Sequence, residues 1–319
     1  WFADADRDGF GADGADSVKA CVDPGGFPAR REGDCDDEDA HVAPDQPEVC
    51  DGVDNDCDPD STEEELISVG STVYEDLQEA IDASDGETVF LCPGVYEGNF
   101  LVRQKGVHLM GLEGPELTIL DGQEDGSVLQ IFGPTTVEGL TLRGGLHEAD
   151  GGGIDGVGAP ELVLRGLVLK ANSAFNGGGL AGPLAGTLLV EDCSFEDNTA
   201  VQGGGAAVFD SATLSGNRFV GNSATVLGGG LYIVTTKKSV ALTGNLYSAN
   251  LAERGAAWWF SGETLSTSGE QAELGVASDC GGAGFLAVGQ WQDSGSTFTD
   301  NSTVNHGGAV YLEVGSGAA

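Results

Sequence analysis

The sequence predicts an all-β protein whose main body is a right-handed parallel β-helix with about 26 residues per coil and an N-terminal helical cap. A small loop-rich domain, held by metal ions and disulfides, is expected before it. Three observations predict this: glycine clusters recur at a fixed interval, the 53 glycines leave little room for long helices, and acidic residues crowd the start of the chain. We expect an acidic head over residues 1–62 and the β-helix over residues 63–319.

The head has too few large apolar side chains to fold unaided. It contains 19 acidic and 4 basic residues, and a segment this polar buries too little apolar surface to offset the entropy of ordering it. Metal ions or disulfides must therefore hold it. The chain also opens inside an acidic motif, as expected of a processed chain or a piece of a longer protein.

Four of the seven cysteines lie in the head, which favours disulfides and an oxidising compartment. The pairing Cys21–Cys35 with Cys50–Cys57 is favoured, although the sequence leaves other pairings open. The remaining three are far apart and are expected to be buried thiols: Cys92, Cys193 and Cys280.

The first acidic motif, "DADRDG", places aspartates on alternate residues and ends in Gly9. Ca²⁺ takes six to eight oxygen ligands, and a loop supplies them from alternate positions around a sharp glycine turn. The stretch resembles thrombospondin type 3 repeats, which implies calcium binding. The expected ligands are Asp4, Asp6, Asp8, the carbonyl oxygen of Phe10, and Asp13 or Asp16 in place of the usual glutamate. The alternative is a solvated acidic turn.

The second acidic motif is "GDCDDEDAHVAPDQPEVCDGVDNDCDPD". It resembles the MopE-type bacterial metal-binding motif across residues 34–58, and departs from it at Pro59, where that motif has glycine. We expect Asp34, Asp36 and Asp39 to converge from one turn. A second loop is expected to supply Asp54, Asp56 and Asp58, with Glu48 nearby. At least two metal sites are therefore predicted in the head.

Calcium is the expected metal, because the candidate ligands are hard carboxylates. Zinc or copper prefers cysteine or histidine, and His41 is the only histidine in the head. Zinc held by four thiolates is the minor alternative.

The β-helix is expected to begin with a capping helix and four short strands. "STVYEDLQEAIDASDG" predicts a helix near residues 72–84, with Thr72 and Glu75 as a capping box and Gly86 after its end. Leu77, Ala80 and Ile81 repeat at helical spacing. "ETVFLCPGVYEGNFLV" and "GVHLMGLEGPELTILDG" each predict two strands.

A repeat then fills the rest of the chain. Glycine clusters begin at residues 151, 177, 203, 228, 255, 281 and 307. An asparagine precedes five of them: Asn172, Asn198, Asn222, Asn250 and Asn301. Three residues before each asparagine lies an apolar or aromatic residue: Leu169, Phe195, Phe219, Tyr247 and Phe298. We expect two or three strands per coil, interior apolar ladders, and asparagines that bond to neighbouring coils and occupy left-handed corners.

Two further resemblances support the β-helix. "LQEAIDASDGETVFLCPGVYEGNFLV" resembles the opening coil of the pectin-lyase-like superfamily. "SFEDNTAVQGGGAAVF" and "TFTDNSTVNHGGAVYL" resemble the repeats of chlamydial polymorphic outer membrane proteins. Together they cover residues 66–319 and are specific for fold rather than function.

The net charge of −39 excludes some partners and favours others. Binding to nucleic acid or to an anionic membrane needs clustered basic residues, so neither is an expected partner. The sequence contains no apolar run of about 18 residues, so no transmembrane helix is predicted. The leading hypothesis is a secreted or cell-surface structural or adhesive protein, non-catalytic, with a calcium-stabilised head. Its expected partners are calcium ions, with glycans, other surface proteins or copies of itself.

Two alternatives stay open. A carbohydrate-binding or carbohydrate-cleaving β-helix would need paired carboxylates or a Lys/Arg pair in a cleft. The basic candidates are few: Arg165, Lys170, Arg218, Lys237, Lys238 and Arg254. Trp258 and Trp259 are possible ligand contacts, because one of two adjacent strand residues points outward. The other alternative is a filament subunit, because "GGAVYLEVGSGAA" ends without a cap.

Overall fold

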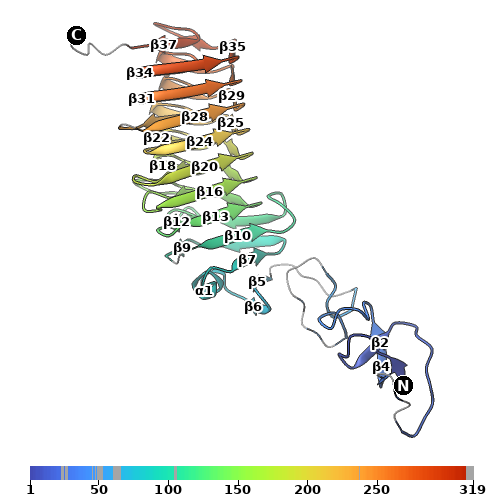
Figure 1. The fold of residues 1–319 in the computed structure, drawn as a ribbon. Helices are drawn as coiled ribbons and strands as arrows, with labels where there is room; N and C mark the ends of the chain where they lie inside the picture. The colour runs from blue at the N-terminus through green and yellow to red at the C-terminus, as the bar shows by residue number, and fades with distance from the viewer. Residues whose placement is uncertain are drawn as a thin grey trace.

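The computed structural model describes residues 1–22, 25, 28–44, 46, 48, 53–59, 66–103, 106–236 and 238–313. Figure 1 shows a loop-rich N-terminal region followed by a long stack of strands. The stack is a parallel β-solenoid of about 11 turns with about 26 residues per coil, so the predicted fold class is confirmed. The predicted boundary after residue 62 lies outside the described residues.

The described residues of the N-terminal region form four short strands in two pairs: β1 (Phe2–Ala3), β2 (Phe10–Ala12), β3 (Pro28–Ala29) and β4 (Arg31–Asp34). β1 pairs with β3 in antiparallel fashion, and β2 pairs with β4 in parallel fashion. The second pairing continues past the strand ends, where the Asp13 amide donates to the Asp34 carbonyl at 2.7 Å. The two acidic motifs are thereby bound side by side.

The solenoid starts with a hairpin and one helix: β5 (Ile67–Val69), β6 (Thr72–Tyr74) and α1 (Leu77–Ala83). α1 buries Leu77, Ala80 and Ile81, as predicted. Its start differs from the prediction, because the N-cap is Asp76, whose carboxylate accepts the Glu79 amide at 2.8 Å. The β-branched and aromatic residues of β6 pair with β5 instead of entering the helix.

Three sheets form the faces of the solenoid, and their strands pair in parallel except where β5 pairs in antiparallel fashion with β6 and β7. The largest continues from β5 and β6 through β7 (Thr88–Leu91), β9 (Phe100–Val102), β10 (Val107–Gly111), β12 (Leu129–Ile131), β13 (Thr135–Glu138), β15 (Ile154–Asp155), β16 (Glu161–Arg165), β19 (Leu180–Ala181), β20 (Thr187–Glu191), β23 (Ala206–Val208), β24 (Ser211–Ser215), β27 (Leu231–Val234), β28 (Ser239–Thr243), β31 (Trp258–Ser268), β34 (Gly284–Ser294) and β37 (Val310–Leu312).

The second sheet contains β8 (Gly94–Glu97), β11 (Thr118–Asp121), β14 (Thr141–Arg143), β17 (Val168–Lys170), β21 (Ser194–Glu196), β25 (Arg218–Val220), β29 (Leu246–Ser248), β32 (Gln271–Glu273) and β35 (Thr297–Thr299). The third contains β18 (Ser173–Asn176), β22 (Thr199–Gln202), β26 (Ser223–Leu227), β30 (Leu251–Arg254), β33 (Val276–Cys280) and β36 (Ser302–Thr303). A middle coil such as β19–β22 thus holds four short strands, more than the two or three predicted.

Each glycine cluster forms a corner of its coil. The first glycine of every cluster has a positive φ, for example +69° at Gly203. A Cβ atom placed there would lie 2.3 Å from the Ala206 carbonyl oxygen. Only glycine therefore fits this corner without moving the backbone.

The five predicted asparagines form a ladder with one break, and all but the half-buried Asn301 are buried. The Asn198 side chain donates to the Leu169 carbonyl at 2.8 Å and to the Asn222 side chain at 3.0 Å. The predicted left-handed conformation belongs to the preceding residue instead, such as Asp197 with φ +52°. At Gly275 the ladder has no side chain, and its amide donates to Asn301.

A second ladder, absent from the sequence prediction, runs through the buried Asn217, Asn245 and Glu270 to the half-buried Ser296. Asn217 donates to the Asn245 side chain at 2.9 Å. Asn245 donates from its backbone and side chain to the Glu270 carboxyl group, and the Glu270 amide donates to the Ser296 hydroxyl. Glu270 is 0% exposed. Its burial raises the pKa of Glu270 from an ordinary 4.5 to about 7.

The predicted apolar ladders fill the interior. The aromatic rings of Phe195 and Phe219 stack with centroids 4.6 Å apart, and those of Phe219 and Tyr247 stack at 5.0 Å. These rings come from the same position of successive coils. Their spacing follows the distance of about 4.8 Å between neighbouring strands, so each coil packs on the next by like-on-like contact.

Candidate metal sites

The aspartates of the first acidic motif accept hydrogen bonds from the backbone of their own loop. The Asp4 carboxylate accepts the Arg7 amide at 2.6 Å and the Gly9 amide at 3.2 Å, and the Asp8 carboxylate accepts the Phe10 amide at 2.7 Å. These bonds gather the carboxylates of Asp4, Asp6 and Asp8 so that one oxygen of each lies within 4.8 Å of the others. The alternate spacing thus produces the convergence that the sequence predicts.

A second cluster joins the two motifs. Oxygens of Asp6, Asp34 and Asp37 lie within 4.8 Å of one another, so Asp6 belongs to both clusters. Asp34 stands at the end of β4, and the Asp37 carboxylate accepts the Ala5 amide at 3.0 Å. Asp37 was not among the predicted ligands, because it approaches Asp6 only through the pairing of β2 with β4.

Buried carboxylate oxygens in these clusters lack hydrogen-bond partners. The atoms are Asp6 Oδ2, Asp8 Oδ2 and Asp34 Oδ2, and the Asp34 side chain belongs to a residue that is only 1% exposed. Burial raises the pKa of Asp6 and of Asp34, and neighbouring carboxylate charges raise both further. A divalent cation would satisfy the oxygens and remove the repulsion, so the residues present fit one.

A third cluster lies in the second motif. Oxygens of Glu48, Asp54 and Asp56 lie within 4.8 Å of one another, and the Glu48 carboxylate accepts the Asp56 amide at 2.7 Å. Burial, followed by the charges of Asp56 and Asp54, raises the pKa of Glu48. All three residues were predicted as ligands of one site.

Several predicted ligands lie outside the clusters found among the described residues. Five of them are exposed: Asp13, Asp16, Asp36, Asp39 and Asp58. The expected convergence of Asp34 with Asp36 and Asp39 is therefore wrong. Asp36 and Asp39 instead hold the local turn, and the Asp39 carboxylate contacts the exposed His41 ring at 2.9 Å, which lowers the pKa of Asp39. The role of the Phe10 carbonyl stays a prediction.

The disulfide pairing differs from the one favoured by sequence. Cys35 bonds to Cys57, across 22 residues, and Cys21 is an exposed free thiol. Cys50, the predicted partner of Cys57, lies outside the described residues. Cys92 is disulfide-bonded rather than a free thiol, whereas Cys193 and Cys280 are buried free thiols as expected. The Cys35–Cys57 bond ties the Asp34 end of β4 to the loop that carries Asp54 and Asp56.

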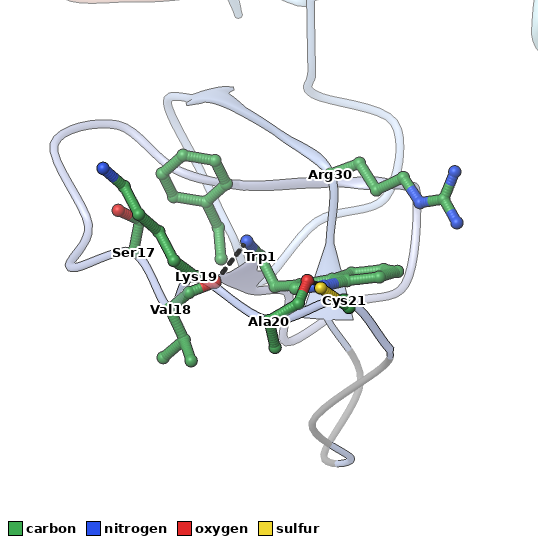
Figure 2. Close-up of a pocket in the computed structure, with 8 residues that line it drawn as sticks. Trp1, Ser17, Val18, Lys19, Ala20, Cys21 and Arg30 are labelled. Atoms are coloured by element: carbon green, nitrogen blue, oxygen red, sulfur yellow. Dashed lines mark hydrogen bonds between the residues drawn. The ribbon is translucent and has the colours of Figure 1, made fainter.

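A separate pocket of about 690 Å³ lies at the start of the chain (Figure 2). The Trp1 amine donates to the Val18 carbonyl at 2.9 Å, and the Arg30 guanidinium lies 4.8 Å from the centre of the Trp1 ring. Among the described residues, those that line this pocket include Lys19 and Arg30 but no acidic side chain. It is therefore unsuited to a cation.

The two tryptophans proposed as ligand contacts are poorly placed for that role. Trp258 is 0% exposed and belongs to the core, so the prediction for it is wrong. The Trp259 ring stacks on Tyr232 at 5.1 Å and on Phe285 at 6.0 Å. Both faces of the Trp259 ring are covered, which leaves only its edge for a ligand.

Two family comparisons match short parts of the chain. Residues 34–63 match a family described as "Putative metal-binding motif", and residues 295–313 match the Chlamydia polymorphic membrane protein repeat. No curated protein and no solved structure matches the chain significantly. The first match covers the cluster of Glu48, Asp54 and Asp56, and the second covers part of one coil near the C-terminal end of the solenoid. Together they fit a surface-exposed β-solenoid protein with a metal-binding motif.

No helix in the part of the chain that the structure describes is long and apolar enough to cross a membrane.

Proposed function

We propose that this protein is a secreted or cell-surface structural or adhesive β-solenoid, without catalytic activity, whose N-terminal region is stabilised by Ca²⁺. The observation that carries the proposal is the sharing of Asp6 between two carboxylate clusters from different motifs. Ions bound there would cross-link residues 4–8 to residues 34–37. The N-terminal region is too polar to fold on apolar burial alone, so this cross-link would supply part of its stability.

The choice of Ca²⁺ rests on the donor atoms. All three clusters consist of carboxylates, without a thiol or imidazole. Such oxygen donors suit calcium, whereas copper and zinc favour nitrogen and sulfur. Mg²⁺ is a weaker candidate, because it keeps several water molecules rather than entering an all-protein cage.

The surface location draws support from the polymorphic membrane protein repeat and from the disulfides, which persist in oxidising compartments. The absence of catalysis is proposed because three solenoid aspartates that could pair as the acid and base of a glycosidase have structural roles. Asp197 and Asp300 occupy left-handed turns, and Asp210 binds Lys238 at 3.1 Å.

The test is metal binding to the full chain by titration calorimetry, with Ca²⁺, Mg²⁺, Zn²⁺ and Cu²⁺ in separate arms. We expect Ca²⁺ to bind most tightly and Asp6→Asn to weaken it by about tenfold or more. Asp13→Asn is the matched control, because it removes the same charge from an exposed residue outside the clusters. Tighter binding of Cu²⁺, or equal effects of the two variants, would contradict the calcium proposal.

The surface role is tested with intact cells that express the chain. Antibody labelling before permeabilisation, and attachment of those cells with Ca²⁺ or a chelator, are the two measurements. Labelling that appears only after permeabilisation would contradict a surface location.

A further inference from the structure

A pocket of about 350 Å³ lies at the N-terminal end of the solenoid, where the end of β6 and the start of α1 meet β8 and the start of β9. This volume is within the range of small-molecule sites. The Tyr96 hydroxyl group in β8 is shared between the carbonyl oxygens of Leu66 and Cys92, at 2.9 Å from each. These bonds fix the Tyr96 ring, so the capping elements themselves form the wall of the pocket.

Three aromatic side chains line this pocket. Tyr74 ends β6, Tyr96 lies in β8 and Phe100 begins β9. Elsewhere in the solenoid aromatic rings stack on one another, as Phe195 does on Phe219. Within the described residues, the Tyr74 and Phe100 rings stack on no other aromatic ring. No second ring therefore occupies their π faces, which carry negative potential and attract a cation.

The charged side chains that line the pocket are acidic. They are Glu75, Asp76 and Glu97, and no basic side chain joins them among the described residues. Asp76 caps α1, whereas Glu75 and Glu97 are exposed and form no ion pair in the described part of the chain. The charge of the pocket therefore favours a cationic ligand.

A metal ion does not suit these carboxylates. In the described chain, oxygens of acidic residues converge to within 4.8 Å in three groups, and none of these groups includes a residue of this pocket. Ca²⁺ needs six to eight oxygen ligands around one point. The pocket instead offers separate carboxylates beside an aromatic and aliphatic wall, which suits a larger cation whose charge is spread out.

The apolar wall also selects among organic cations. A primary ammonium ion is strongly hydrated, and its N–H donors would face side chains that accept no hydrogen bond. A quaternary ammonium ion has no N–H donor and presents methyl groups that carry part of its charge. Such a group can pack on aromatic rings and still be attracted by nearby carboxylates.

We propose that this pocket binds a quaternary ammonium group of the choline type, with its methyl groups against Tyr74 and Phe100 and its charge balanced by Glu75 and Glu97. The step is binding without bond cleavage. Free solutes and choline lipid headgroups both carry this chemistry. The pocket lies on the solenoid, so the inference goes beyond the proposed Ca²⁺ binding and does not depend on it.

The experiment is a saturation-transfer NMR titration of the full chain with choline, with ethanolamine, and with the neutral isostere dimethylbutanol, in which carbon replaces the nitrogen. We expect choline to bind in the millimolar range and the two analogues to bind about tenfold more weakly or less. No saturable choline binding in that range, equal binding of the isostere, or tighter binding of ethanolamine would overturn the proposal.

A sedimentation arm with phosphatidylcholine vesicles distinguishes the two sources. Sedimentation that excess choline releases would identify the lipid headgroup as the ligand. Choline binding without sedimentation would identify a free solute. Both results support the pocket.

Variants locate the site. Tyr74→Leu is expected to weaken choline binding by about tenfold and Tyr74→Phe to retain it, because the ring rather than the hydroxyl group contacts the cation. Glu97→Gln, an isosteric change at an exposed position, is expected to weaken it about three- to tenfold.

The matched controls lie outside the pocket. Tyr232→Leu removes a half-buried ring from β27, and Glu273→Gln removes an exposed charge from β32. Neither should change choline binding. Equal losses in Tyr74→Leu and Tyr232→Leu, or in Glu97→Gln and Glu273→Gln, would place the ligand elsewhere and refute the pocket.

Discussion

Replacing Glu270 with glutamine is expected to stabilise the solenoid at neutral pH. The Glu270 carboxyl group takes the place of an amide in a buried ladder. It accepts hydrogen bonds from Asn245 and faces the Tyr247 hydroxyl. The next coil adds the Asp293 carboxylate and the Ser296 hydroxyl rather than a cation. A charged carboxylate at this place therefore loses its water without gaining a counter-ion.

The size of the effect follows from the raised pKa. The pKa of Glu270 is about 7 in the folded chain against an ordinary 4.5. Between these values the folded state binds more protons at Glu270 than the unfolded state, so the contribution of Glu270 to stability is greatest below about pH 4.5 and falls as pH rises to about 7. At about 1.4 kcal/mol per pH unit, ionisation of Glu270 costs on the order of 3 kcal/mol at pH 8.

The assay is denaturant unfolding of the wild type and Glu270→Gln at pH 5 and pH 8. The variant is expected to gain on the order of 3 kcal/mol at pH 8 and much less at pH 5, because the glutamine oxygen can still accept Asn245. Glu273→Gln, an exposed glutamate in β32, is the control and should leave the pH dependence unchanged. An unchanged or lower stability of Glu270→Gln at pH 8 would refute the reasoning.

Three further predictions concern the ladders, the corners and the disulfide. Asn222→Ala removes a buried side chain that forms hydrogen bonds with Phe195, Asn198 and Asn250, and should lower the free energy of unfolding in denaturant by about 3 kcal/mol. Asn176→Ala, at a half-buried position, should lower it by about 1 kcal/mol. Gly203→Ala should lower the melting temperature clearly more than Gly244→Ala, since both glycines have φ above +60° but only Gly203 has backbone within 3 Å of the added carbon. The Cys35→Ser/Cys57→Ser double variant should destabilise the N-terminal region by about 3 kcal/mol, as measured by amide hydrogen exchange, and Cys21→Ser should have no effect. Equal effects within any of these pairs would contradict the corresponding argument.

The solenoid could be predicted from sequence because its geometry requires the same residue type at the same place in each coil. Gly203 and Gly228 open equivalent corners, and Asn198 and Asn222 repeat in one ladder. The second ladder was missed because its members change chemical type, from Asn245 to Glu270 to a serine. Burial there depends on position in the coil, which the residue type alone does not reveal.

The N-terminal region was less predictable because its contacts join distant segments. Local spacing was enough to gather Asp4, Asp6 and Asp8 around one loop. The approach of Asp37 to Asp6 depends on the pairing of β2 with β4, for which residues 10–34 carry no periodic signal. The same holds for the cysteines, since several pairings satisfy the sequence and only the fold selects Cys35 with Cys57.

The regular register of the coils also determines how the solenoid can change in length. Removing residues 178–203 would join Gly177 directly to Gly204, and each ladder residue would meet its counterpart one coil further along. The rod would shorten by about 4.8 Å, the spacing between adjacent strands. Removing half as many residues would set corners against strands and asparagines against apolar side chains. Lengthening or shortening of this rod by duplication or loss of sequence is therefore restricted to whole coils.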